Sequence, residues 1–178
     1  MSAFFKKQPV KLKEKIIHQF VFVEVPAEVV WPEFIRWANT EWWPKDSQLK
    51  VLSSTSDEPN VGVRYRQTLT KPMSPKWDPL APRWEVEITK FIPQQMLERT
   101  FVRGPLAGYE NIQFEWRYNG TRIDYELHYR VKGLHNKFFW NLASEKLYAQ
   151  SMKLILESFK RYITKLYQDQ NSKKLDNP

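Results

Sequence analysis

Apolar and polar residues alternate with a period of two along most of the middle of the chain. The pattern is clearest in four segments, which are Val63–Leu69, Trp84–Thr89, Ile112–Tyr118 and Ile123–Val131. Such alternation predicts strands with one buried face and one wet face, as in an antiparallel sheet. Asn119-Gly120 separates the last two segments and favours a tight hairpin. Shorter strands are expected at 17–25, 49–54 and 96–102, so we predict a curved meander.

Other segments carry the three-to-four-residue spacing of helices. Val30, Phe34 and Trp37 share one face of a helix that begins at Ala27, and Pro32 requires this helix to be short or bent. A second brief helical piece is expected at 40–43. From Asn136 to about Tyr167 the apolar spacing predicts one long C-terminal helix, whose first turns are alternatively a loop. The fold class is therefore α+β, with a single domain at 17–167, a basic flexible arm at 1–16 and a polar tail at 168–178.

Several short motifs occur in the order expected of one superfamily. They are the segment Val23–Trp31, a Trp at 42 or 43, Val61-Gly62-Val63-Arg64, and Gly120-Thr121-Arg122-Ile123. In this order the chain resembles the SRPBCC superfamily over about residues 17–165, and it is closest in pattern to polyketide cyclase/dehydrase-like proteins. The resemblance implies a helix-grip fold, in which a curved sheet wraps around the last helix and leaves an internal cavity. It implies no particular reaction, because members include carriers, enzymes and proteins of other roles.

Bulky residues of the predicted sheet and helix would line such a cavity. The expected apolar and aromatic ligand-binding residues are Tyr65, Trp84, Phe114, Trp116, Tyr125, Tyr129, Met152, Leu156 and Phe159. A pocket of this character suits an apolar or aromatic small molecule. The alternative is that these side chains fill the space completely and the domain is solid.

Three polar residues have a phase that points toward the same space, namely Gln67, Arg99 and Glu145. A buried charge has to be paired or solvated. Arg99 and Glu145 would therefore pair with each other or hold the polar end of a ligand. A slip of one residue would instead place Glu98 and Thr100 inside and Arg99 in solvent.

The segment between two of the strands, residues 71–82, contains four prolines. Long connections in compact domains are often functional rims or lids. Met73, Trp77 and Leu80 have no strand alternation that would bury them, so we predict that they form a lid or portal over the cavity. The alternative is a stiff surface loop.

Composition removes several classes of chemistry. The chain has no Cys, which excludes disulfides and thiolate metal sites, and its three His show no metal-ligand spacing. No nucleotide-binding or nucleophile motif is present, so we expect no metal and no cofactor. With no apolar run at the N-terminus and none long enough to span a membrane, we expect a cytoplasmic location.

The net charge is +8, with lysines concentrated in the first fifteen residues and again along the last helix. This distribution fits either a solvated face or transient contact with an anionic membrane surface, and nucleic acid is a weaker alternative. Our leading hypothesis is a carrier or sensor of a hydrophobic small molecule such as a lipid, a polyketide or an isoprenoid-like compound. The alternatives are a cyclase/dehydrase-type enzyme and a basic interaction module.

Overall fold

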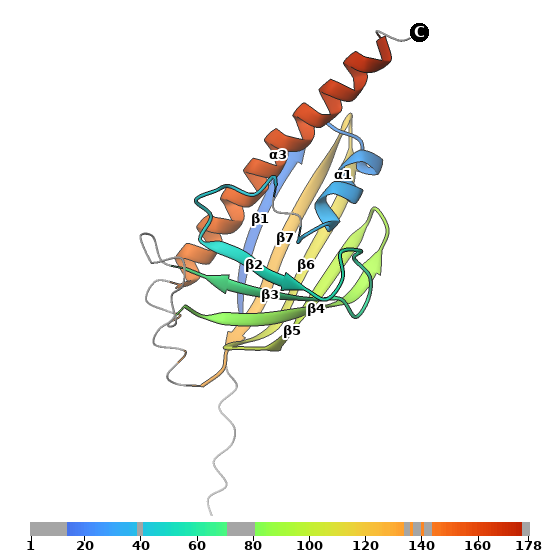
Figure 1. Ribbon diagram of the computed structural model, residues 1–178. Coiled ribbons are helices and arrows are strands. Elements are labelled where there is room, and N and C mark those ends of the chain that lie inside the picture. The colour runs from blue at the N-terminus through green and yellow to red at the C-terminus, as the bar shows by residue number, and fades with distance from the viewer. Residues whose placement is uncertain are drawn as a thin grey trace, which may run out of the picture.

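The computed structural model describes residues 14–38, 41–70, 81–133, 136, 140 and 144–175. Its strands are β1 (Lys15–Val23), β2 (Leu49–Ser54), β3 (Arg64–Leu69), β4 (Arg83–Ile92), β5 (Met96–Arg103), β6 (Leu106–Arg117) and β7 (Gly120–Val131). Its helices are α1 (Ala27–Ile35) and α3 (Glu145–Leu175). The strands form one antiparallel sheet in the order β1-β7-β6-β5-β4-β3-β2. The curled sheet lies against α3 (Figure 1), which confirms the predicted fold class.

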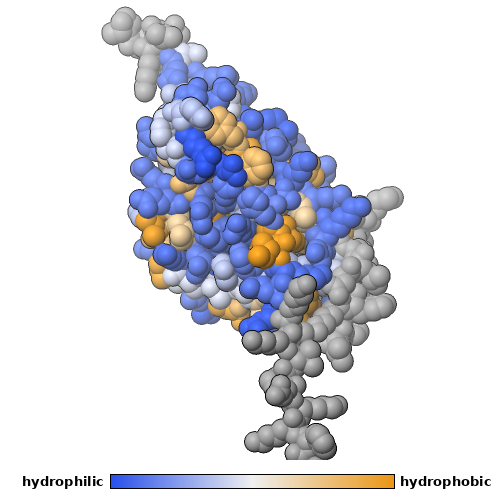
Figure 2. Space-filling view, turned by 180° about the vertical axis from the view of Figure 1, so that it is seen from behind, coloured by the Kyte–Doolittle hydropathy of each residue, from blue (hydrophilic) through white to orange (hydrophobic). Residues whose placement is uncertain are grey.

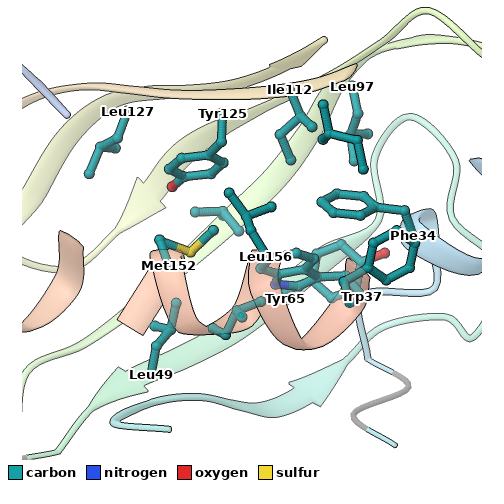
Figure 3. Close-up of a cluster of buried hydrophobic side chains, with 14 of the residues drawn as sticks. Phe34, Trp37, Leu49, Tyr65, Leu97, Ile112, Tyr125, Leu127, Met152 and Leu156 are labelled. Carbon is teal, nitrogen blue, oxygen red and sulfur yellow. The ribbon is translucent and has the colours of Figure 1, made fainter. Parts of the chain in front are cut away.

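Packing of α3 against the sheet creates the core. The helix residues that are at most 1% exposed are Tyr148, Ser151, Met152, Ile155, Leu156, Phe159 and Ile163, with the spacing of one helix face. Figure 3 shows Met152 facing Tyr125 and Leu127 of β7. Every second residue of β7 from Ile123 to Tyr129 is fully buried, as the alternation predicts. The sheet alone could not bury this face, so its stability depends on the helix.

An aromatic cluster connects α1 to both layers. The ring of Phe34 lies 5.3 Å from Phe114 of β6 and 5.0 Å from Phe159 of α3, measured between centroids, with both pairs edge to face. Trp42 extends the cluster and lies 4.9 Å from Phe159. Edge-to-face pairs are a favoured geometry for aromatic rings. They fix α1 across one end of the space between sheet and helix.

The structure differs from the predicted elements in two helical segments. Glu41–Trp43 form a turn rather than a helix, and residues 39–40 lie outside the described residues. The helix α3 continues to Leu175 instead of ending near Tyr167. No Gly or Pro lies between these two positions, and Gln and Lys are good helix formers, so nothing stops the helix there. From Gln168 to Lys173 its side chains are exposed.

The last hairpin is also shifted by one residue from the prediction. Arg117 pairs with Gly120, so Tyr118 and Asn119 form the two-residue loop, and Tyr118 takes a positive φ of 56°. Gly120 is needed for space rather than for φ. A Cβ at this position would lie 2.3 Å from the carbonyl oxygen of Val23 on the neighbouring strand β1.

We therefore predict that Gly120→Ala destabilises the protein by roughly 3 kcal/mol or more, because the backbone of β1 has to move away. Gly62→Ala is the matched control. Gly62 has a φ of +91° but no atom within 4 Å of an added Cβ, so only the backbone conformation resists the change, at about 1–2 kcal/mol. Urea unfolding of both variants measures the difference. Equal losses would show that β1 yields freely at this point.

Candidate functional site

Four polar side chains meet in the interior between the sheet and α3, where apolar side chains would be expected. Arg99 of β5 and Glu110 of β6 are 0% and 1% exposed, and Tyr125 of β7 and Tyr148 of α3 are fully buried. We call these four residues the interior polar cluster. Removing ionised groups from water is costly unless they are paired, so their arrangement decides whether the interior can tolerate them.

Strand register brings the two charges together. Arg99 and Glu110 are direct cross-strand partners, and Nε of Arg99 lies 2.7 Å from Oε2 of Glu110. Above the guanidinium lies the ring of Trp37, whose centroid is 4.2 Å from Cζ. The ring of Tyr65 is farther away, at 6.0 Å. Arg99 is thus held by an ion pair on one side and by cation–π contact on another.

The second oxygen of Glu110 faces the two tyrosines. Tyr148 donates a hydrogen bond of 2.6 Å to Oε1, Tyr125 donates one of 3.0 Å to the same atom, and the two hydroxyl oxygens are 2.6 Å apart. Two hydroxyl protons therefore serve three short contacts around this carboxyl group. Oε1 of Glu110 is well solvated by the protein itself.

Burial raises the pKa of both Tyr125 and Tyr148 well above the usual range, and the negative charge of Glu110 raises each of them further. Both hydroxyls consequently keep their protons at neutral pH and act as hydrogen-bond donors. Burial also raises the pKa of Tyr65, against the opposing effect of the Arg99 charge.

Two further polar groups lie in the same interior. Nε1 of Trp84 donates a hydrogen bond of 2.8 Å to Oε1 of the buried Gln67. Within the described part of the chain, Nε2 of Gln67 and the hydroxyl of Tyr129 have no hydrogen-bond partner of good geometry. Trp140 and Glu145 are nevertheless close enough to Tyr129 to influence its pKa, which burial raises.

Most of the predicted ligand-binding residues do lie in the interior. Those that are at most 7% exposed are Tyr65, Gln67, Trp84, Arg99, Phe114, Tyr125, Tyr129, Met152, Leu156 and Phe159. The burial of Leu97, Arg99 and Phe101 settles the phase of β5 and excludes the one-residue slip. Their role in ligand binding stays a prediction. The proposed lid residues Met73, Trp77 and Leu80 lie outside the described residues.

Two predicted residues are not in the interior. Glu145 stands in the first turn of α3 with a side chain that is 36% exposed, and it pairs with Lys15 at 2.6 Å rather than with Arg99. The buried helix face begins at Tyr148, so the predicted stripe is wrong in its first turns, whereas Met152, Leu156 and Phe159 are buried as predicted. Trp116 is 53% exposed, since the buried positions of β6 end at Phe114 and residues 115–117 are all exposed.

Sequence analysis missed Glu110 and Tyr148. Glu110 has the same phase as Ile112 and Phe114, and extending that alternation two residues toward the N-terminus would have placed it inside. Tyr148 lies four residues before Met152 on the buried helix face. The strand alternation therefore indicates Glu110 as the carboxylate partner of an inward Arg99, and the helical spacing indicates that Tyr148 is buried.

Hollows on the described surface lie outside the interior polar cluster. One of about 450 Å³ lies beside β2 and includes Trp43 and Leu49, and another of about 350 Å³ is lined by Arg66, Arg83, Trp84, Glu85, Arg103 and Gly104. Figure 2 shows that the face seen from behind is mostly hydrophilic, with separate small apolar patches. Among the described residues, no group of three metal-ligating side chains occurs and no helix meets the length and hydropathy needed to cross a bilayer.

No protein-family model matches the sequence, and no curated protein matches it either. Solved structures do match its fold. The protein TTHA0849 from Thermus thermophilus aligns at a TM-score of 0.62 with 13% identity, over 84% of this chain and 97% of that one. Norcoclaurine synthase from Thalictrum flavum, in complex with dopamine and hydroxybenzaldehyde, aligns at 0.61 with 11% identity, over 93% and 97%.

Ara h 8.0201 aligns at a TM-score of 0.54 with 15% identity, over 85% of this chain and 98% of that one. The fold is the helix-grip fold. Identities this low carry the architecture and leave the chemistry to the residues of this chain.

The ion pair predicts a distinctive pattern of stability. Arg99→Met and Glu110→Leu each leave one buried charge without its partner, so each should lower the free energy of unfolding by ~3–5 kcal/mol. The double variant, with an apolar pair of similar volume, should recover much of that loss. Glu145→Leu is the control and should cost less than about 1 kcal/mol, because its pairing with Lys15 is exposed. Chemical denaturation of the four variants measures this, and additive losses would contradict the pairing.

The tyrosines predict a loss of stability in alkali. Unfolded tyrosines release their protons near pH 10, whereas the buried pair in the folded state keeps them to higher pH. The unfolded state then binds fewer protons, so the free energy of unfolding falls as the pH rises above about 10. Tyr148→Phe should make this decline shallower between pH 9 and 11 in urea titrations. Tyr118→Phe, at a residue that is 94% exposed, should leave it unchanged.

Proposed function

We propose that this protein binds a hydrophobic small molecule between the curled sheet and α3, as a carrier or sensor. The observation that carries the proposal is the interior polar cluster. It places hydrogen-bonding groups inside an otherwise apolar space, together with donors that have no acceptor in the described part of the chain. Buried polar groups are nearly always satisfied in native proteins, by protein, water or ligand. A bound molecule would supply what these groups lack.

The lining of this space favours an aromatic or polycyclic ligand over a flexible chain. Tyr65, Trp84 and Phe114 present rings from three different strands, and α3 adds Met152, whose unbranched side chain adapts to irregular shapes. Flat rings offer large contact areas with few rotatable bonds. Lipid, polyketide and isoprenoid-like compounds all have apolar surface, and the ones with rings would fit this lining best.

Acid–base catalysis of the cyclase/dehydrase type is a second candidate. It is favoured by one observation, the contact of a single carboxylate oxygen with two tyrosine hydroxyls. A carboxylate in this position can take up a proton, and a tyrosine hydroxyl can donate a hydrogen bond to a substrate oxygen. The raised pKa of both tyrosines makes them donors of hydrogen bonds rather than of protons at neutral pH. This favours binding over turnover.

Binding of N-phenyl-1-naphthylamine, an uncharged fluorescent probe, tests the leading proposal. We expect one molecule per chain with micromolar affinity. Leu156→Phe fills the interior next to the sheet, at a residue that is 1% exposed, and should weaken binding at least tenfold. Leu154→Phe on the same helix is the matched control, since Leu154 is 48% exposed, and it should bind as the unchanged protein does. Weak, non-saturable binding that is equal in all three proteins would contradict the proposal.

A further inference from the structure

The guanidinium of Arg99 has hydrogen-bonding capacity that the protein does not use. Within the described residues, Nη1, Nη2 and Nε all lack an acceptor in good geometry, although the residue is 0% exposed. The contact of 2.7 Å from Nε to Oε2 of Glu110 is an ion pair by distance but lacks hydrogen-bond geometry, so Oε2 is likewise without a donor among the described residues. A guanidinium carries five N–H groups and cannot discard its charge by deprotonation. Its unused donors therefore need an oxygen from elsewhere.

A second donor without a partner lies beside the first. The ring of Trp37 covers the guanidinium at 4.2 Å, and Nε1 of Trp37 also lacks an acceptor among the described residues. Trp37 is 1% exposed, so bulk water does not compensate for the missing bond. Two neighbouring buried side chains thus offer only hydrogen-bond donors. A group that only accepts hydrogen bonds would satisfy them.

Charge is already balanced at this point. Glu110 neutralises Arg99 at 2.7 Å, and Tyr125 and Tyr148 stabilise its other oxygen. Adding a carboxylate or phosphate would leave a net negative charge in a buried apolar space, at a cost that grows with burial. The guanidinium therefore still needs hydrogen-bond acceptors, whereas its positive charge is already balanced by Glu110.

We propose that the Nη groups of Arg99, with Nε1 of Trp37 beside them, bind an uncharged oxygen acceptor of the ligand, a ketone, ester, amide or quinone carbonyl. This inference rests on the proposed function and specifies its ligand class. The apolar body of the ligand then lies against the aromatic and aliphatic lining, and its carbonyl is read at Arg99. Anionic ligands of the same shape are rejected because Glu110 already occupies the place of the counter-ion.

Three naphthalenes of nearly equal shape separate the contributions. 2-Acetylnaphthalene presents a carbonyl, 2-isopropenylnaphthalene replaces that oxygen with carbon, and 2-naphthoate carries a charge. By calorimetry at pH 7.5 we expect the ketone to bind about 10-fold or more tightly than the hydrocarbon, as a hydrogen bond from a charged donor provides. The carboxylate should bind at least 10-fold more weakly than the ketone.

Substitutions at the cluster assign the preference to Arg99. In the Arg99→Met/Glu110→Leu double variant the ketone and hydrocarbon should bind within about twofold of each other, with hydrocarbon affinity retained. Arg99→Lys is the variant to measure if the double variant does not fold. It keeps the charge but removes the guanidinium, and it should also lower the preference for the ketone over the hydrocarbon. Arg117→Met is the control, because Arg117 is exposed and pairs with Glu115.

Each outcome has a defined meaning. Equal binding of ketone and hydrocarbon by the unchanged protein would overturn the inference while leaving the proposed function intact, since ordered water would then be the partner of Arg99. Tightest binding of the carboxylate would overturn it as well, because Arg99 would be a charge receptor. Failure of all three compounds to bind would contradict the proposed function itself.

Discussion

Contact between α3 and the concave side of the sheet is the interaction on which the rest of this structure depends. Seven strands present a nearly continuous apolar face, and a single helix face from Tyr148 to Ile163 covers it. Burial of such large side chains contributes most of the favourable free energy of folding. The aromatic cluster around Phe34 closes one end of the same interior, so α1 depends on both the helix and the sheet for its position.

Within this apolar interior the protein retains a buried salt bridge between Arg99 and Glu110. Replacement of a buried ion pair by apolar residues is often neutral or stabilising, so an ion pair kept in a core is weak support for a purely structural role. Here the geometry adds to that reasoning. Glu110 receives two tyrosine hydroxyls and an arginine, whereas Arg99 receives a carboxylate and an aromatic face but too few acceptors. By hydrogen-bond geometry Oε2 of Glu110 also lacks a donor, but all three side-chain nitrogens of Arg99 lack an acceptor among the described residues. This excess of donors supports our proposal of a ligand that supplies oxygen.

The fold gives this cluster its setting without determining its use. Helix-grip structures with 11–15% identity to this chain include a norcoclaurine synthase and Ara h 8.0201. Such similarity transfers the arrangement of sheet and helix, while the chemistry of the interior has to be argued from the residues of this chain. Our proposal of a carrier rather than a catalyst therefore rests on Arg99, Glu110 and the two tyrosines, whose raised pKa values keep their hydroxyls protonated as hydrogen-bond donors.

The sequence by itself determined the elements and most of the buried faces. Period-two alternation depends only on local backbone geometry, so strands such as those predicted at Val63–Leu69 and Ile123–Val131 followed from it. It favoured an inward Arg99, and the burial of β5 decided that phase. Tertiary structure decided which inward residues meet and where coverage ends. Glu145 had a helical spacing that also predicted an inward side chain. Arg99 is nevertheless paired with Glu110, because strand register decides which residues are cross-strand neighbours. Trp116 keeps the inward phase yet remains exposed, since burial requires a covering element and the buried positions of β6 end at Phe114.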